Sequence, residues 1–321
     1  MMKLPSNLSK SKSKSQLYSG DPYFRDTWDD LKTLFDSDAS IVEQFQDVSL
    51  VILRPDAIVN QRLEKFICIV KDMGLVPFFA TSFIYSRHMV REGWRYQLNI
   101  ATPERIEVMD MILSHAPSIL IMFHKTEKTK LDPHLPLTLQ LSEMKGPSDP
   151  LKRSPSDFRS LLGDAQVSVL TYLHISDEPA DVIREMGIFL SKQERLSCLS
   201  NLQVKKDYSN EVQLLINDQY KIQPAQSLIE SSAYAAINQR SHKINGDDKN
   251  HTAVVDAIVE LKQRDNTNWK ALFSVCEKQN VPITIWEKVA IAGPNSKGHF
   301  EQLHPVLPDV SISDWKKDSK G

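Results

Sequence analysis

Hydrophobic and polar positions between residues 48 and 190 predict strands and helices that alternate along the chain. Runs of apolar residues, typical of buried strands, predict four strands, at residues 48–53, 75–85, 118–123 and 166–173. Apolar residues three and four positions apart predict helices, at residues 62–73, 88–97, 103–115 and 179–190. Ser176 or Asp177 is expected to cap the last of these helices. Four strands among helices indicate an α+β domain.

The regions on either side of this part have different patterns. Residues 22–48 predict one or two short helices. After residue 195 most of the chain has helical spacing, and the helices are expected at residues 210–216, 225–238, 252–263 and 269–278. Residues 283–290 predict a strand, and the polar run at residues 241–251 predicts a loop.

The first residues have a composition of their own. Lysines alternate with serines, and no acidic residue precedes Asp21. This composition predicts a solvated, disordered tail. The expected division is therefore a tail at 1–21, a helical lead-in at 22–47, an α+β domain at 48–195 and a mostly helical C-terminal domain or extension at 196–321. A length of 321 residues suits two domains of about 100 to 200 residues each.

Overall composition excludes several classes of partner. Hydrophobic residues make up 41% and charged residues 25%, with a net charge of −2, so no large positive field draws the chain to nucleic acid or anionic membranes. No run of about 18 apolar residues could span a bilayer. The three cysteines lack the spacing of a metal site and are expected to be reduced thiols. A cytoplasmic protein is the expectation.

His174 is the candidate for covalent chemistry. An apolar segment leads to this imidazole, the hydroxyl of Ser176 follows two positions later, and Glu185 lies eleven residues downstream on a predicted helix. Such a set suits nucleophilic catalysis, in which a neutral imidazole attacks and a second group fixes its tautomer. The alternative is that His174 ends a strand and Glu185 is a solvated helix charge.

Three segments resemble the nucleoside diphosphate kinase family in order and spacing. They are Arg54-Pro55-Asp56-Ala57, then Ser148-Asp149-Pro150 followed by Pro155 and Arg159, then His174-Ile175-Ser176-Asp177 followed by Glu185-Met186-Gly187. The family has Lys-Pro-Asp-Gly, Thr-(Asn/Asp)-Pro with Pro and Arg, and His-Gly-Ser-Asp with Glu-x-Gly at these places. The resemblance covers roughly residues 48 to 190.

The resemblance implies a fold and a reaction. The fold would be a ferredoxin-like antiparallel sheet with helices on one face. His174 would carry the terminal phosphoryl group of a nucleoside triphosphate to a nucleoside diphosphate or another acceptor, with Mg²⁺ bridging the phosphates. Ser176 and Glu185 would orient His174. A homo-oligomer is also implied. The residues expected to bind nucleotide or phosphate are Arg54, Ser148, Arg159, Trp94 and Thr171.

Departures from the family pattern keep other functions open. Ser142 stands where the family has a second phosphate-binding arginine, and Thr171 where it has an asparagine. The connection between residues 123 and 148 is longer than in the family. The chain is therefore a divergent phosphotransferase with an altered acceptor, a catalytically weak or inactive nucleotide-binding or regulatory module, or a scaffold.

Two glycines near the C-terminus have the separation of a phosphate-binding loop. However, His299 and Phe300 follow Gly298 where lysine and serine or threonine are required. The segment is therefore interpreted as an exposed turn. His299 and His304 would bind a metal only together with carboxylates that the sequence does not locate.

Overall fold

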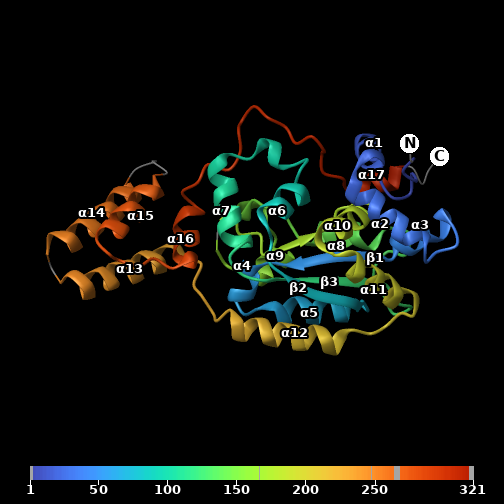
Figure 1. Cartoon of the computed structure of the whole chain (residues 1–321), viewed down its shortest axis with the longest axis horizontal. Helices are drawn as coiled ribbons and strands as arrows, with labels where there is room; N and C mark the ends of the chain where they lie inside the picture. Colours follow the sequence, from blue (N-terminus) through green and yellow to red (C-terminus); the bar gives the residue numbers. More distant parts are fainter. Residues whose placement is uncertain (1–2, 166, 247, 264–267, 318–321) are drawn as a thin grey trace.

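The computed structural model of the chain describes residues 3–165, 167–246, 248–263 and 268–317 (Figure 1). Within these ranges, one four-stranded sheet forms the centre of the molecule, and helices surround it. No helix in the described ranges is long and apolar enough to cross a membrane.

The sheet has the order β2-β3-β1-β4, and its neighbouring strands are antiparallel. This is the order of a ferredoxin-like sheet, so the predicted fold class is confirmed. The strands are β1 (Val48–Leu53), β2 (Val76–Phe83), β3 (Ser118–His124) and β4 (Leu173–Ile175). Three of them coincide with predicted strands.

The fourth strand is much shorter than the predicted strand at 166–173, whose first residue, Gln166, lies outside the described ranges. The backbone of Tyr172 has a φ of 63°, which interrupts an extended chain. Its N–H donates to Oδ2 of Asp56 at 2.9 Å rather than to a neighbouring strand. The strand prediction is therefore wrong before Leu173, although His174 does lie in a strand and pairs with Ile52.

Helices cover both faces of the sheet, rather than the one face that the resemblance implies. All residues of β1 and β3 are buried. In Figure 1 α8 and α10 lie above the sheet, and α5 and α12 lie below it. The helices between the strands are α4 (Pro55–Val59), α5 (Leu63–Asp72), α6 (Arg87–Gly93), η1 (Leu98–Ile100), α7 (Pro103–Leu113), α8 (Leu137–Met144), η2 (Pro150–Lys152) and α9 (Phe158–Leu162).

Helix α10 (Pro179–Phe189) follows the last strand, as predicted. Its cap is Glu178 rather than Ser176 or Asp177, because the Glu178 side chain accepts from the third helical residue and Asp181 accepts from the Glu178 N–H at 2.9 Å. The Ser176 hydroxyl is thereby left for Glu185.

The described part of the N-terminal segment packs on the domain, so the prediction of a solvated tail is wrong there. It forms α1 (Lys12–Gly20), and α2 (Pro22–Lys32) and α3 (Asp38–Gln46) follow. Leu4 and Leu8 are buried. Nζ of Lys14 lies 2.6 Å from Asp181 and 2.8 Å from Glu178, so a residue that suggests a solvated tail is a buried ion-pair partner.

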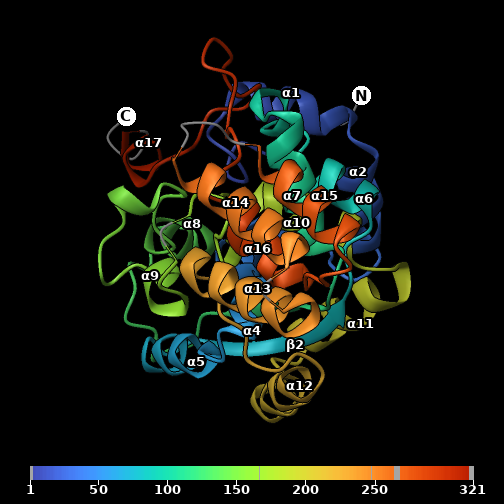
Figure 2. The same ribbon diagram turned by 90° about the vertical axis from the view of Figure 1, so that its left-hand side faces the viewer.

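The region after residue 190 is mainly helical, as predicted. It contains α11 (Lys192–Gln203), α12 (Ser209–Ile222), α13 (Glu230–Asn245), α14 (Lys249–Gln263), α15 (Trp269–Lys278), α16 (Ile285–Ala292) and α17 (Ile312–Lys317). Helices α13 to α16 form a separate group that faces the viewer in Figure 2, and α16 packs against α7.

Two predictions in this region are wrong. The expected strand at 283–290 is mostly helix α16, because Thr284 and Glu287 form a reciprocal capping box that starts a helix. Much of the expected loop at 241–251 is helical instead, since α13 continues to Asn245 and α14 begins at Lys249, while Asp247 lies outside the described residues.

A C-terminal segment, defined here as residues 293–311, returns from α16 to the α+β domain. It passes over α7 and α6 in Figure 1. Backbone hydrogen bonds fix it there: Phe300 N to Ile100 O at 2.8 Å and Val306 N to Tyr96 O at 2.9 Å. The segment thus lies against the connection between α6 and α7.

Candidate active site

His174 is held by a carboxylate. Its Nε2 lies 2.8 Å from Oε2 of Glu185, and the Ser176 hydroxyl donates to the same oxygen at 2.7 Å. The side chains of His174 and Glu185 are 14% and 7% exposed. An ionised carboxylate only accepts, so in the neutral imidazole Nε2 carries the proton and Nδ1 is the nitrogen with a free lone pair. This is the tautomer in which Nδ1 is nucleophilic.

Helix α10 carries Glu185 and packs closely against α2 two residues further along, at Gly187. Gly187 lies against α2, where a Cβ would meet the carbonyl oxygen of Tyr23 at 2.3 Å. The glycine of the Glu-x-Gly pattern therefore allows α2 to approach α10, and its role in this chain is packing.

Arg54, directly after β1, is buried, and each of its three side-chain nitrogens has a partner. Its Nε lies 3.0 Å from Oδ1 of Asp56, and Nη2 donates to the carbonyl oxygen of Val169 at 3.1 Å. Nη1 donates to the hydroxyl of Thr171. Thr171, which stands where the family has an amide, therefore orients a guanidinium.

Two further arginines, Arg159 and Arg105, lack a carboxylate partner among the described residues. Arg159 is 9% exposed; its Nη1 donates to the carbonyl oxygen of Gly146, and its Nε has no partner. Burial lowers the pKa of Arg159 to about 10, and Arg153 and Arg54 add to the effect. Burial also lowers the pKa of Arg105, with a contribution from Arg54. Like charges are thus held together with incomplete compensation.

These groups line a cavity of about 180 Å³. None of its described lining residues is an aspartate or glutamate. The lining residues are Arg54, Trp94, Gln97, Leu98, Ala101, Arg105, Met109, Ser148, Arg159, Val169, Thr171, Leu173, His174 and His299. A cavity with three guanidinium groups and two imidazoles suits a multiply charged anion.

A second cavity, of about 560 Å³, has a different character. It shares Trp94, Gln97, Ser148, Arg159 and His174 with the first, so His174 borders both. The second cavity is rich in carboxylates. Those that line it are Glu143, Asp177, Asp181, Glu185, Asp309 and Asp314.

Ser142 also lines the second cavity, where its hydroxyl donates to Oδ1 of Asp177 at 2.6 Å. Nζ of Lys145 lies 2.7 Å from the same oxygen. Burial alone would raise the pKa of Asp177, but Lys145 and Lys14 hold it well below its usual range. A cation, Lys145, thus lies three residues after Ser142, and it pairs with Asp177.

The structure places all the predicted site residues together: His174, Ser176, Glu185, Arg54, Ser148, Arg159, Trp94 and Thr171. Trp94 meets the His174 ring edge-on, with centroids 5.3 Å apart. Their roles stay predictions. Sequence reasoning missed Arg105, which is hidden in an amphipathic helix pattern, and Lys145. The sequence indicates His299 only through a phosphate-loop motif that fails and as a metal ligand together with His304, and it predicts no place for His299 at this site.

Protein side chains at the first cavity do not fit a magnesium site. Mg²⁺ prefers oxygen ligands, carboxylates above all, and the described lining residues supply only hydroxyl and amide oxygens besides cations. No group of three or more metal-ligating side chains is found in the described ranges. Magnesium bound through phosphates stays a prediction of the family resemblance.

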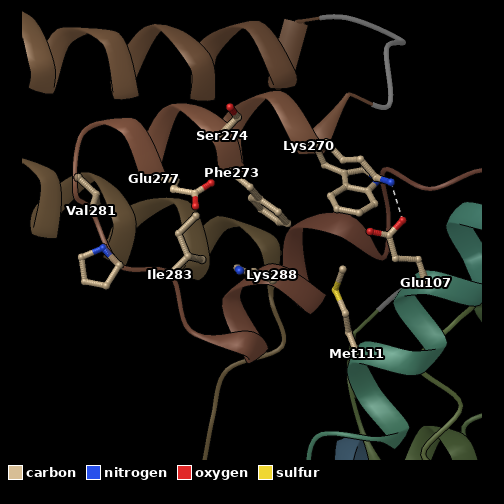
Figure 3. Close-up of a pocket in the computed structure, with 11 residues that line it drawn as sticks. Glu107, Met111, Lys270, Phe273, Ser274, Glu277, Val281, Ile283 and Lys288 are labelled. Carbon is tan, nitrogen blue, oxygen red and sulfur yellow. Dashed lines mark hydrogen bonds and ion pairs between the residues drawn. The ribbon is translucent and has the colours of Figure 1, made fainter. Parts of the chain in front are cut away.

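A third cavity, of about 500 Å³, lies apart from His174, between α7 and helices α15 and α16 (Figure 3). Nζ of Lys270 lies 2.5 Å from Oε2 of Glu107 across it. It shares no lining residue with the two cavities at His174.

No family model and no curated protein matches the sequence. Solved structures of nucleoside diphosphate kinases are similar to 46% of this chain, each with a TM-score of 0.38. The kinase from Aquifex aeolicus is 19% identical and is covered over 97% of its chain. The kinase from Halobacterium salinarum, in complex with CDP, is 16% identical and is covered over 90%.

Proposed function

We propose that the protein is a phosphotransferase that takes the terminal phosphoryl group of a triphosphate, such as a nucleoside triphosphate, onto His174 and passes it to an acceptor. One observation carries this proposal: a cavity lined by three arginines and no described carboxylate ends at a histidine that Glu185 holds in one tautomer. Nucleotide partners and a homo-oligomeric assembly belong to the same proposal.

The side chains support a two-step reaction. Nδ1 of His174 attacks the terminal phosphorus while the bond to the bridging oxygen breaks, and the diphosphate leaves with the electron pair. The proton on Nε2 stays directed at Glu185. Arg159 and Arg105 would stabilise negative charge on the phosphates, because positioning and charge compensation dominate catalysis of phosphoryl transfer. In the second step an acceptor oxygen attacks the phosphorus of the phosphohistidine, the nitrogen–phosphorus bond breaks, and its electron pair returns to Nδ1 of His174.

Ser148 and Trp94 would complete the donor site. Ser148 lines both cavities, and its hydroxyl would donate to a phosphate oxygen. Trp94 restricts rotation of the His174 ring through its edge contact. Because His174 borders the second cavity too, an acceptor other than a nucleoside diphosphate can be accommodated on that side.

A second candidate function is a nucleotide-binding, regulatory or scaffold module with weak or no catalysis. The engagement of Arg54 favours it, because the guanidinium is occupied by Asp56, Val169 and Thr171. Such an arginine supports the walls of the cavity rather than a reacting phosphate. In that case the protein binds triphosphate but His174 takes no label.

Labelling separates the two functions. The full chain is incubated with magnesium and ATP or GTP labelled in the γ-phosphate, and acid-labile, base-stable label is measured. We expect label in the wild type and none in His174→Asn. His134→Asn is the matched control, because His134 is an exposed histidine outside the site. Equal label in wild type and His174→Asn would reject the phosphohistidine.

A further inference from the structure

The first cavity is small for a whole nucleotide. Its volume is about 180 Å³, whereas pockets for drug-sized ligands measure about 300 to 1,000 Å³. Trp94 is the one Trp, Tyr or Phe among the described lining residues, and it already packs edge-on against His174. The cavity therefore offers charge for a phosphate chain and little surface for a base.

The C-terminal segment closes one rim of this cavity. His299 lines the cavity, and its backbone forms an isolated antiparallel bridge with Ala101. On both sides of it the backbone is fixed: Phe300 N donates to Ile100 O at 2.8 Å, and Thr102 N donates to Gly298 O at 3.3 Å. These backbone hydrogen bonds on both sides fix the position of His299 at the rim.

Arg105 reaches the same rim from α7. Its Nη1 lies 3.4 Å from the Ser168 hydroxyl, and a Cβ on Gly298 would lie 3.7 Å from Nη1. Burial lowers the pKa of His299, and Arg105 adds to the effect. A polyanion placed between the two side chains would offset the positive charge of Arg105, which disfavours a charged His299. It would also favour protonation of His299.

We propose that the cavity recognises the phosphate chain of the donor alone, with Arg105 and His299 binding the end that is not transferred. Inorganic tripolyphosphate would then be as good a phosphoryl donor as a nucleoside triphosphate. The proposal rests on the phosphotransferase function above and identifies its donor class.

The reaction with tripolyphosphate balances. Nδ1 of His174 attacks a terminal phosphorus, a nitrogen–phosphorus bond forms, and the phosphorus–oxygen bond to the bridging oxygen breaks. Pyrophosphate leaves with the electron pair of that bond, so nothing is oxidised or reduced. Arg105 and His299 hold the departing pyrophosphate, and the Nε2 proton remains between His174 and Glu185.

Binding is measured by calorimetry on the full chain with tripolyphosphate, ATP and GTP. We expect the three dissociation constants to agree within about threefold, because the base adds no contact. Arg105→Gln should weaken all three by about tenfold or more, as for loss of a charge-assisted contact, and His299→Gln should weaken them in the same direction. Arg87→Gln and His304→Gln are matched controls, because both residues are exposed and outside the cavity.

Two results would overturn the proposal. The first is ATP or GTP binding more than about tenfold tighter than tripolyphosphate, which would place the base in the second cavity. The second is unchanged binding of tripolyphosphate in both Arg105→Gln and His299→Gln.

Labelling keeps this inference separate from the proposed function. Terminally labelled tripolyphosphate should label the wild type and leave His174→Asn unlabelled. If ATP labels His174 and tripolyphosphate does not, the phosphotransferase stands and the donor class is wrong. If neither labels His174 although both bind equally, the phosphotransferase is wrong and recognition of the phosphate chain stands.

Discussion

Nε1 of Trp315 donates to Oε1 of Glu178 at 3.0 Å, so α17 is tied to the cap of the helix that carries Glu185. The N-terminal segment reaches the same carboxylate, through the Ser9 hydroxyl at 2.7 Å and the Lys10 N–H at 2.8 Å. Both described ends of the chain therefore hold α10 in place. Since α10 orients His174 through Glu185, the two ends support the candidate site without touching the imidazole.

We predict that Glu185→Gln slows labelling of His174. The amide keeps the size of the side chain but loses the charge that accepts the Nε2 proton, and its NH₂ group can force the opposite tautomer. A lost charge-assisted hydrogen bond of about 1.5 to 3 kcal/mol corresponds to a rate about tenfold to a hundredfold lower. Single-turnover labelling measures this rate.

The matched control is Glu211→Gln, because Glu211 is an exposed helix glutamate on α12. Ser176→Ala should have a smaller effect in the same direction, since Ser176 acts on Glu185 and not on the ring. An unchanged rate in Glu185→Gln would show that the pair only completes the core.

We predict that Arg159→Met stabilises the free protein and abolishes its response to phosphate chains. The buried guanidinium has no carboxylate partner among the described residues, so its removal relieves a desolvation cost. We expect a Tm higher by about 2 °C or more. Tripolyphosphate should raise the Tm of the wild type and leave that of the variant unchanged.

Arg95→Met is the control for this substitution, because the Arg95 side chain is 53% exposed. It should respond to tripolyphosphate like the wild type. A variant at Arg159 that is less stable than the wild type in the free state would mean that the bond to Gly146 outweighs the cost of burial.

Part of the site could be predicted from the sequence because its residues are close together along the chain. The hydroxyl of Ser176 and the carboxylate of Glu185 lie two and eleven positions from His174, within one strand, turn and helix. Arg105 and His299, by contrast, meet only because the C-terminal segment pairs with Ala101. No pattern along the chain indicates that contact.

The errors in the fold prediction also have local physical causes. The composition of the lysine-rich and serine-rich N-terminal segment predicts a solvated tail. Composition does not reveal that Lys14 forms ion pairs with the buried carboxylates of Glu178 and Asp181, which lie far away in the sequence. The apolar run before His174 has strand composition, but the positive φ of Tyr172 breaks it. In each case a tertiary contact outweighs the local preference.

We predict that Lys145→Gln makes the protein less dependent on pH in acid. Burial would raise the pKa of Asp177 in the folded state. The charges of Lys145 and then Lys14 outweigh this effect and hold the pKa below its ordinary value. Asp177 thus contributes stability that is present above about pH 4, the unfolded value, and is lost as pH falls through the folded value.

Without Lys145 the pKa of Asp177 is lowered less on folding, so less stability is lost as pH falls. The measurement is the difference in Tm between pH 6 and pH 3, which should be larger in the wild type than in Lys145→Gln. Lys152→Gln is the control, because the Lys152 side chain is 75% exposed. Equal differences in the three proteins would show that other carboxylates govern acid unfolding.

We predict that Lys14→Met strongly destabilises the fold, against the expectation for a residue in a solvated tail. Its side chain is 4% exposed and meets Asp181 and Glu178, so the substitution leaves two buried carboxylates without their cation. Breaking a buried pair in this way costs about 3 to 5 kcal/mol. Urea unfolding measures the loss, and Lys12→Met, at an exposed position on the same helix, should be close to neutral.

The loss of stability in Lys14→Met should also depend on pH, and the charges determine in which direction. Burial alone would lower the pKa of Lys14, but Asp181 and Glu178 raise it above its ordinary value. The stabilising contribution of Lys14 is therefore complete below about pH 10 and is lost as pH rises through the folded value. In Lys14→Met the unpaired carboxylates take up protons more readily, which relieves the variant in acid. The difference in unfolding free energy between wild type and variant should thus be larger at pH 8 than at pH 5. A difference that is small at both values would mean that the N-terminal segment detaches without cost to the domain.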